Sequence, residues 1–176
     1  MPLTVLTGGA RSGKSRWAVR LAENVGGPVT MIATAEALDD DMAERIERHQ
    51  RERPAGWRTI EDPRQLAGAI SSVEAGATVI VDCLTLWLSN LVLDGLSEGE
   101  LLARATDGAD AAKAHDGRVI AVTNEVGSGV VPPTELGRRF ADLLGLVNQV
   151  WVERSDRAAL VVVGRLLWLP ADGSHG

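Results

Sequence analysis

The sequence predicts an α/β fold with a mainly parallel, doubly wound sheet and a nucleotide-binding phosphate loop (P-loop) after the first strand. Short β-branched runs alternate with longer stretches of helical period, which is typical of βαβ crossovers. The first four runs are nearly continuous in apolar character, as in strands covered on both faces. A glycine-rich segment, residues 8–15, follows the first run. We therefore expect a single domain over residues 1–176.

Six β-branched or apolar runs are predicted strands. They are residues 3–7, 29–33, 78–83, 118–123, 149–153 and 159–164. The strand order cannot be derived from this pattern. The stretch 127–133 combines glycines with Pro132 and Pro133 and is expected to be a loop.

Apolar residues at helical spacing predict helices between these strands. Trp17, Leu21 and Val25 repeat every four residues after Lys14, before a Gly-Gly-Pro stop. Residues 39–53 form a second expected helix, which a proline terminates. Three further helices are expected at 63–74, at 97–115 and around Leu136, Phe140, Leu143 and Val147.

Composition and charge exclude several classes of protein. The 176 residues are 45% hydrophobic and 24% charged, which is the globular range. A net charge of -6 provides no basic footprint for nucleic acid or an anionic membrane. Cys83 is the only cysteine, so a disulfide framework is excluded. With neither a secretory signal nor a membrane span in the sequence, we expect a cytoplasmic protein.

The pattern G-x-x-x-x-G-K-[ST] is met by Gly8, Gly13, Lys14 and Ser15. Backbone N–H groups of such a loop hold phosphate oxygens, the lysine reaches the β- and γ-phosphates, and the serine hydroxyl ligates Mg²⁺. The alternative is a glycine-rich turn that only joins strand to helix. Lys14 argues against that alternative, because only it and Lys113 are lysines among 18 basic residues.

A carboxylate for the metal shell is expected at the end of another apolar strand. Asp82 closes the run 78–83 and suits that role, although many strands end in aspartate. Hydrolytic P-loop proteins often follow this aspartate with a second carboxylate that activates water, whereas Cys83 follows here. This favours group transfer to a bound substrate over ATP-driven mechanical work.

The helix at 39–53 carries a histidine on its apolar stripe. His49 lies three residues after Ile46 and seven after Met42, so it is expected to face inward. A packed core histidine is one interpretation. The other is a nucleophile that attacks a nucleotide α-phosphate, because arginines that suit an anion surround it. Those arginines also fit an ordinary surface helix; they are Arg45, Arg48, Arg51 and Arg53.

Six segments together resemble one enzyme family. They are TGGARSGKS (7–15), IATA (32–35), DMAERIERHQRERPAGWRTIEDP (41–63), DCLTLWLSNL (82–91), VTNEVGSGVVP (122–132) and LGRRFADLLGLVNQ (136–149). In order and spacing they resemble the bifunctional adenosylcobinamide kinase/adenosylcobinamide-phosphate guanylyltransferases of cobalamin biosynthesis. The arrangement H-x-x-x-R-P-x-x-W-x-T-x-E, from His49 to Glu61, is the most specific part.

The resemblance implies two reactions on a corrinoid. A nucleoside triphosphate, ATP or GTP, phosphorylates adenosylcobinamide with Mg²⁺. GTP then guanylylates a histidine, matched by His49, and the GMP moves to adenosylcobinamide phosphate. The resemblance also implies a fold like that of recombination ATPases and a homotrimer. The acidic charge balance separately predicts no nucleic-acid partner.

The matched motifs imply the following site residues. Lys14 and His49 are expected to be catalytic, and Ser15 and Asp82 to hold the metal. The residues expected to bind the nucleotide are Gly8, Gly9, Ala10, Arg11, Ser12, Gly13, Lys14, Ser15, Ala33, Thr34, Ala35, Gln50, Arg51, Glu52, Arg53, Glu61 and Asp82.

Some questions stay open in the sequence. Glu125 could orient a substrate hydroxyl, hold metal or brace its loop. Arg165-Leu166 replaces the Ile-Pro expected after Gly164, a departure that is expected to affect only the last strand and the subunit contact. Two rival functions are a P-loop kinase with one activity and an ATPase module that acts on a macromolecular partner.

Overall fold

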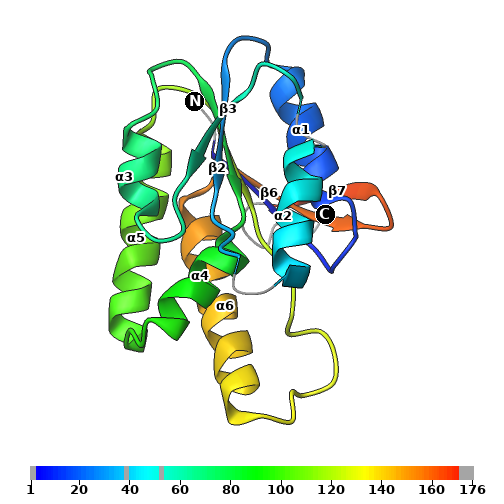
Figure 1. Cartoon of the computed structure of the whole chain (residues 1–176), viewed down its shortest axis with the longest axis vertical. Helices are drawn as coiled ribbons and strands as arrows, with labels where there is room; N and C mark the ends of the chain where they lie inside the picture. The colour runs from blue at the N-terminus through cyan, green and yellow to red at the C-terminus, as the bar shows by residue number, and fades with distance from the viewer. Residues whose placement is uncertain (1–2, 38–39, 52–53, 171–176) are drawn as a thin grey trace.

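A computed structural model describes residues 3–37, 40–51 and 54–170 of the chain (Figure 1). Its strands are β1 (Leu3–Thr7), β2 (Val29–Ala33), β3 (Arg58–Glu61), β4 (Thr78–Asp82), β5 (Val119–Val122), β6 (Arg157–Val162) and β7 (Arg165–Leu169). Its helices are α1 (Lys14–Glu23), α2 (Asp40–Arg51), α3 (Leu66–Ser71), α4 (Leu84–Leu93), α5 (Glu98–Ala114) and α6 (Glu135–Arg154).

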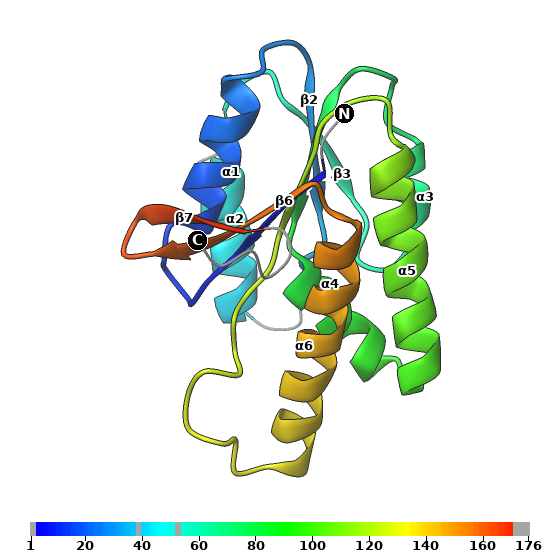
Figure 2. The ribbon, with the colours of Figure 1, turned by 180° about the vertical axis from the view of Figure 1, so that it is seen from behind.

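Within the described residues, the strands form one seven-stranded sheet in the order β3-β2-β4-β5-β1-β6-β7. Strands β3 to β6 in this order pair in parallel, and only β7 is antiparallel to its neighbour β6. Helices cover both faces of the sheet (Figures 1 and 2). The predicted α/β class with a mainly parallel, doubly wound sheet is therefore confirmed.

Alternating side chains divide the core into two layers. In β4, Val79 and Val81 pack with α3, α4, α5 and α6, whereas Ile80 packs on the opposite face with α1. Helix α2 lies on the same side of the sheet as α1 (Figures 1 and 2). Because β1 is central, the loop that follows it lies at the carboxyl edge of the sheet between β5 and β6.

The predicted strand at 149–153 is wrong. These residues belong to the long helix α6, which runs to Arg154. Their β-branched character favours a strand locally, but Leu143, Val147 and Trp151 continue the buried stripe of the helix at four-residue spacing. Trp151 is fully buried against this layer of the core, so tertiary packing overrides local propensity.

Three elements were not expected from the sequence. Strands β3 and β7 lie at the two edges of the sheet: β3 has no apolar run, and in β7 the apolar residues 166–169 alternate between half-buried and exposed. Helix α4 is apolar on nearly all sides and therefore shows little amphipathic period. The first helix is also shorter than expected, because α1 ends at Glu23 and Val25 is exposed beyond it.

Candidate nucleotide site at the carboxyl edge of the sheet

The phosphate loop joins β1 to α1 and depends on glycine at its first position. Gly8 has φ = 151°, and a Cβ atom added to it would lie 2.3 Å from the carbonyl oxygen of Val161 on β6. Gly13 is left-handed, with φ = 102°, immediately before the helix. A side chain at Gly8 would collide with the backbone of β6, and one at Gly13 would strain the left-handed backbone, so both positions of the loop require glycine.

Lys14 begins α1 and is only 7% exposed. Its Nζ donates to the carbonyl oxygens of Gly8 (2.8 Å) and Gly9 (2.7 Å). Burial lowers the pKa of Lys14, and the nearby Cys83 and Asp82 oppose that shift. The ammonium is thus positioned inside the loop by the loop's own backbone.

Asp82 ends β4 beside this loop. Its carboxylate is half-buried and close enough to raise the pKa of Lys14 against the effect of burial. Ser15 lies on the first turn of α1, next to Lys14. Hydroxyl and carboxylate oxygens are the hard donors that Mg²⁺ prefers, so the chemistry of Ser15 and Asp82 fits this ion.

Cys83 follows Asp82 and is buried, and burial raises the pKa of its thiol to about 11. The thiol is therefore neutral near pH 7 and is no nucleophile there. The hydroxyl of Thr34 accepts from Cys83 N (2.9 Å) and donates to Cys83 O (2.7 Å). Thr34, expected among the nucleotide residues, is thus fully buried and joins the ends of β2 and β4.

Helix α2 contains His49, but the position of the His49 side chain lies outside what the structure describes. Glu52 and Arg53 also lie outside the described residues. At the end of α2, Gln50 Nε2 donates to Glu61 Oε1 at the end of β3 (3.2 Å). The structure therefore brings together two predicted site residues that are eleven positions apart. Arg51, in contrast, pairs with Glu47 on the exposed helix surface.

Glu125 begins the loop after β5 and contacts the phosphate loop through its backbone. Its N–H donates to the carbonyl oxygen of Gly8 (3.1 Å). Its carboxylate accepts from the N–H of Gly127 (2.9 Å) and is otherwise exposed. Bracing of the loop, one of the roles left open by the sequence, is thus observed directly.

The β6–β7 hairpin also holds the phosphate loop, which sequence reasoning missed. Gly164 N donates to Ser12 O (2.8 Å), and Trp17 Nε1 donates to Gly164 O (2.9 Å). The departure at Arg165-Leu166 does not prevent the last strand from forming. A sequence pattern could not reveal this contact, because it requires β6 to lie next to β1.

The sequence matches the protein family described as "Cobinamide kinase / cobinamide phosphate guanyltransferase" over residues 4–169. The chain belongs to this family. It is 46% identical over 168 residues to the bifunctional adenosylcobalamin biosynthesis protein CobP of Pseudomonas aeruginosa, covering 91% of this chain and 92% of that protein. It is 37% identical over 175 residues to the bifunctional adenosylcobalamin biosynthesis protein CobU of Escherichia coli, covering 92% and 96%.

Solved structures with low sequence identity to this chain share its fold. A Pyrococcus horikoshii OT3 protein superposes with a TM-score of 0.60 at 6% identity, covering 98% of this chain and 88% of that one. The RadB recombinase superposes with a TM-score of 0.51 at 15% identity, covering 90% and 73%. The expected likeness to recombination ATPases is therefore confirmed at the level of the fold.

Family membership makes the chain a transferase that uses a nucleoside triphosphate, as the phosphate loop predicts. Among the described residues, no helix is both long and apolar enough to cross a membrane. Nor do the described residues gather three or more histidine, cysteine or acidic side chains around one point.

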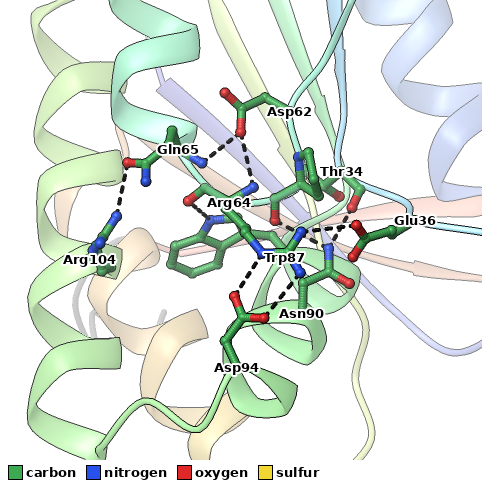
Figure 3. A network of polar contacts seen from close by, with 10 residues as sticks. Thr34, Glu36, Asp62, Arg64, Gln65, Trp87, Asn90, Asp94 and Arg104 are labelled. Carbon is green, nitrogen blue, oxygen red and sulfur yellow. Dashed lines mark hydrogen bonds and ion pairs between the residues drawn. The ribbon is translucent and has the colours of Figure 1, made fainter. Parts of the chain in front are cut away.

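A polar network beside the site fixes the segment between β2 and α2 (Figure 3). Arg64 pairs with Glu36 at 3.0 Å and with Asp94 at 2.7 Å. Asn90 Nδ2 donates to the carbonyl oxygens of Thr34 (2.8 Å) and Pro63 (3.2 Å). The network ties the segment that leads into the histidine-bearing helix to the core helix α4.

Replacement of Asn90 by alanine should lower the free energy of unfolding by about 1–3 kcal/mol, because two backbone carbonyls would lose their buried donor. Urea unfolding measures this change. Ser89→Ala, on the same helix, is the matched control and should change stability by less than about 0.5 kcal/mol. Equal effects of the two substitutions would contradict the role given to Asn90.

Proposed function

We propose that this chain phosphorylates adenosylcobinamide and then transfers GMP to the product through a covalent intermediate on His49. The final product is adenosyl-GDP-cobinamide. Family membership supports both activities, and one observation carries the shared site: a phosphate loop with a buried lysine lies on the sheet edge that α2 also borders. We assign these activities to one domain over residues 1–176.

In the first reaction, the hydroxyl oxygen of the aminopropanol group attacks the γ-phosphorus of ATP or GTP. The new P–O bond forms as the bond from the γ-phosphorus to the β–γ bridging oxygen breaks, and the nucleoside diphosphate leaves with that electron pair. The hydroxyl proton passes to solvent. Lys14 stabilises the developing charge on the phosphates, and the loop N–H groups from Gly8 to Gly13 orient them.

In the second reaction, a neutral imidazole nitrogen of His49 attacks the α-phosphorus of GTP and pyrophosphate leaves. A phosphate oxygen of adenosylcobinamide phosphate then attacks the same phosphorus. The P–N bond breaks, the imidazole recovers its electron pair, and a diphosphate linkage forms. In this proposal the same phosphate loop binds the triphosphate in both reactions, so Lys14 acts in both.

The remaining site residues complete this proposal. Mg²⁺, held by Ser15 and Asp82, would neutralise charge on the phosphate oxygens. The residues that we assign to nucleotide binding besides the loop are Ala33, Thr34, Ala35, Gln50, Arg51, Glu52, Arg53, Glu61 and Asp82. The contact between Gln50 and Glu61 supports this assignment because it joins two of its segments. We expect a cytoplasmic homotrimer without a nucleic-acid partner.

Two GTP analogues separate the reactions. An α,β-methylene analogue blocks cleavage at the α-phosphorus, so with adenosylcobinamide it should yield adenosylcobinamide phosphate and no GDP derivative. A β,γ-methylene analogue should not phosphorylate adenosylcobinamide, but it should convert adenosylcobinamide phosphate to adenosyl-GDP-cobinamide. A kinase with one activity would fail the second assay. An ATPase module would release phosphate from GTP without modifying any corrinoid, and that result would overturn the proposal.

A further inference from the structure

The backbone of β5 stays extended beyond the end of the strand and runs beside the phosphate loop. Thr123 N donates to the carbonyl oxygen of Leu6 (2.9 Å). Two residues later in both segments, Glu125 N donates to the carbonyl oxygen of Gly8 (3.1 Å). This repeat of two residues is the pattern of a parallel ladder, so residues 123–125 continue the strand. Successive side chains along such a segment point to opposite faces of the sheet.

This alternation fixes the direction of the Asn124 side chain. Thr123 is fully buried, and its hydroxyl donates to Asn148 Oδ1 on α6 (2.7 Å) and lies 3.5 Å from the hydroxyl of Thr85 on α4. Thr123 therefore faces the layer of α4 and α6, and Asn124 faces the other side of the sheet, where α1 and α2 lie (Figures 1 and 2). Val122, two residues before Asn124, packs in the layer of α1 as this alternation requires.

The strand order places Asn124 between the two halves of the phosphate site. Strand β5 lies between β1, which leads into the phosphate loop, and β4, which ends at Asp82. Asn124 comes two residues after Val122, the register partner of Asp82. On the other side, Lys14 Nζ and the N–H that follows Asn124 bond to the same carbonyl oxygen, that of Gly8. Because Lys14 reaches the β- and γ-phosphates, Asn124 lies at the edge of the sheet where the terminal phosphate is held.

Asn124 combines a fixed backbone with a carboxamide that has no partner among the described residues. Its N–H donates to Thr85 Oγ1 (2.9 Å), and its carbonyl oxygen accepts from Asn148 Nδ2 (3.1 Å). These two side chains come from different helices and hold the residue in place. In the part of the chain that the structure describes, the half-buried carboxamide itself forms no hydrogen bond. The polar network thus orients a donor toward the phosphate site without using it for the fold.

We propose that Asn124 is a further catalytic residue, whose carboxamide Nδ2 donates a hydrogen bond to a γ-phosphate oxygen of the triphosphate in the phosphate loop. The inference rests on the proposed function only in that this loop binds a nucleoside triphosphate. A donor that is already oriented stabilises charge on the phosphate at little cost in conformational entropy. The γ-phosphoryl group is transferred in the kinase reaction, whereas in guanylyl transfer it leaves unchanged within pyrophosphate. The contact should therefore affect the chemical step of the kinase reaction more.

Asn124→Ala tests this contact because it removes the carboxamide but keeps the backbone N–H and C=O that Thr85 and Asn148 hold. Dissociation constants for GTP and GDP are measured by titration calorimetry with Mg²⁺. We expect about tenfold weaker affinity for GTP, unchanged affinity for GDP and an unchanged unfolding temperature. The kcat of the kinase reaction should fall about 100-fold, and that of guanylyl transfer less than about threefold. Asn124→Asp has the same shape but a charge that repels phosphate, so its affinity for GTP should fall further.

Asn24→Ala, at the exposed end of α1 that lies away from the phosphate loop, is the matched control and should bind and react like the wild type. Unchanged GTP affinity in Asn124→Ala would overturn the inference. An equal loss for GTP and GDP would also overturn it, because Asn124 would then act through the phosphate loop. If the wild type binds GTP but modifies no corrinoid, the proposed function fails while the comparison of GTP with GDP still decides the role of Asn124. If it binds no nucleotide, both fail.

Discussion

His49→Ala should abolish guanylyl transfer while the variant still phosphorylates adenosylcobinamide. The expected loss in the transfer rate is roughly 10⁴-fold or more, because the side chain supplies the atom that becomes bonded to phosphorus. The kinase rate should change less than about threefold, since that reaction needs no covalent intermediate on the protein. Separate assays with adenosylcobinamide and with its phosphate measure the two rates.

His115→Ala is the matched control for this prediction. His115 follows α5 at the amino edge of the sheet, where its Nε2 lies 2.9 Å from the carbonyl oxygen of Ala77. Its loss should leave both rates of the folded enzyme near the wild-type values. Loss of both activities in His49→Ala with the fold intact would show that His49 acts in the shared triphosphate site and is not a nucleophile for one reaction.

Lys14→Ala should reduce kcat/KM of both reactions by about 10²- to 10³-fold, because one ammonium stabilises charge on the phosphates in both transition states. The fold should persist. Burial of the Lys14 charge opposes folding, whereas its bonds to Gly8 and Gly9 favour it, so the unfolding temperature should change little. Steady-state kinetics and thermal unfolding test both statements.

Lys113→Ala, at the only other lysine of the chain, is the control for loss of a positive charge. Lys113 pairs with Asp156 at an exposed position (2.6 Å) and should be dispensable for both reactions. If Lys14→Ala lost the kinase but kept full guanylylation, the two reactions would use different triphosphate sites.

The central strands and the phosphate loop could be predicted because their signals are local. A strand buried on both faces, such as β4, is apolar whatever its neighbours are, and the loop is a contiguous motif. The edge strand β3 could not be predicted in this way, because its side chains are mostly exposed. The edge strand β7 is apolar over residues 166–169, but it is not buried on both faces and forms by pairing with β6 alone. The end of α6 shows the converse, a β-branched segment held helical by packing around Trp151.

The contacts that hold the loops of the site in place depend on the order of the strands, so they could not be predicted from the sequence. Gly164 contacts the phosphate loop only because β6 lies next to β1, with Thr4 paired to Arg157, 153 residues away in the chain. Asn90 reaches Thr34 only because α4 follows β4, the neighbour of β2. The sequence stretch that contains Asn90 matched the family, but a match alone does not distinguish a structural amide from one that binds substrate.

In the proposed function, one phosphate loop presents GTP to a nucleophilic histidine on α2. The most direct test is to incubate the protein with α-labelled GTP and Mg²⁺, denature it, and measure radioactivity on the chain. We expect a label that is acid-labile and base-stable, as for a P–N bond, and that is absent from His49→Ala. A wild-type protein without label, or equal labelling of His49→Ala, would contradict it.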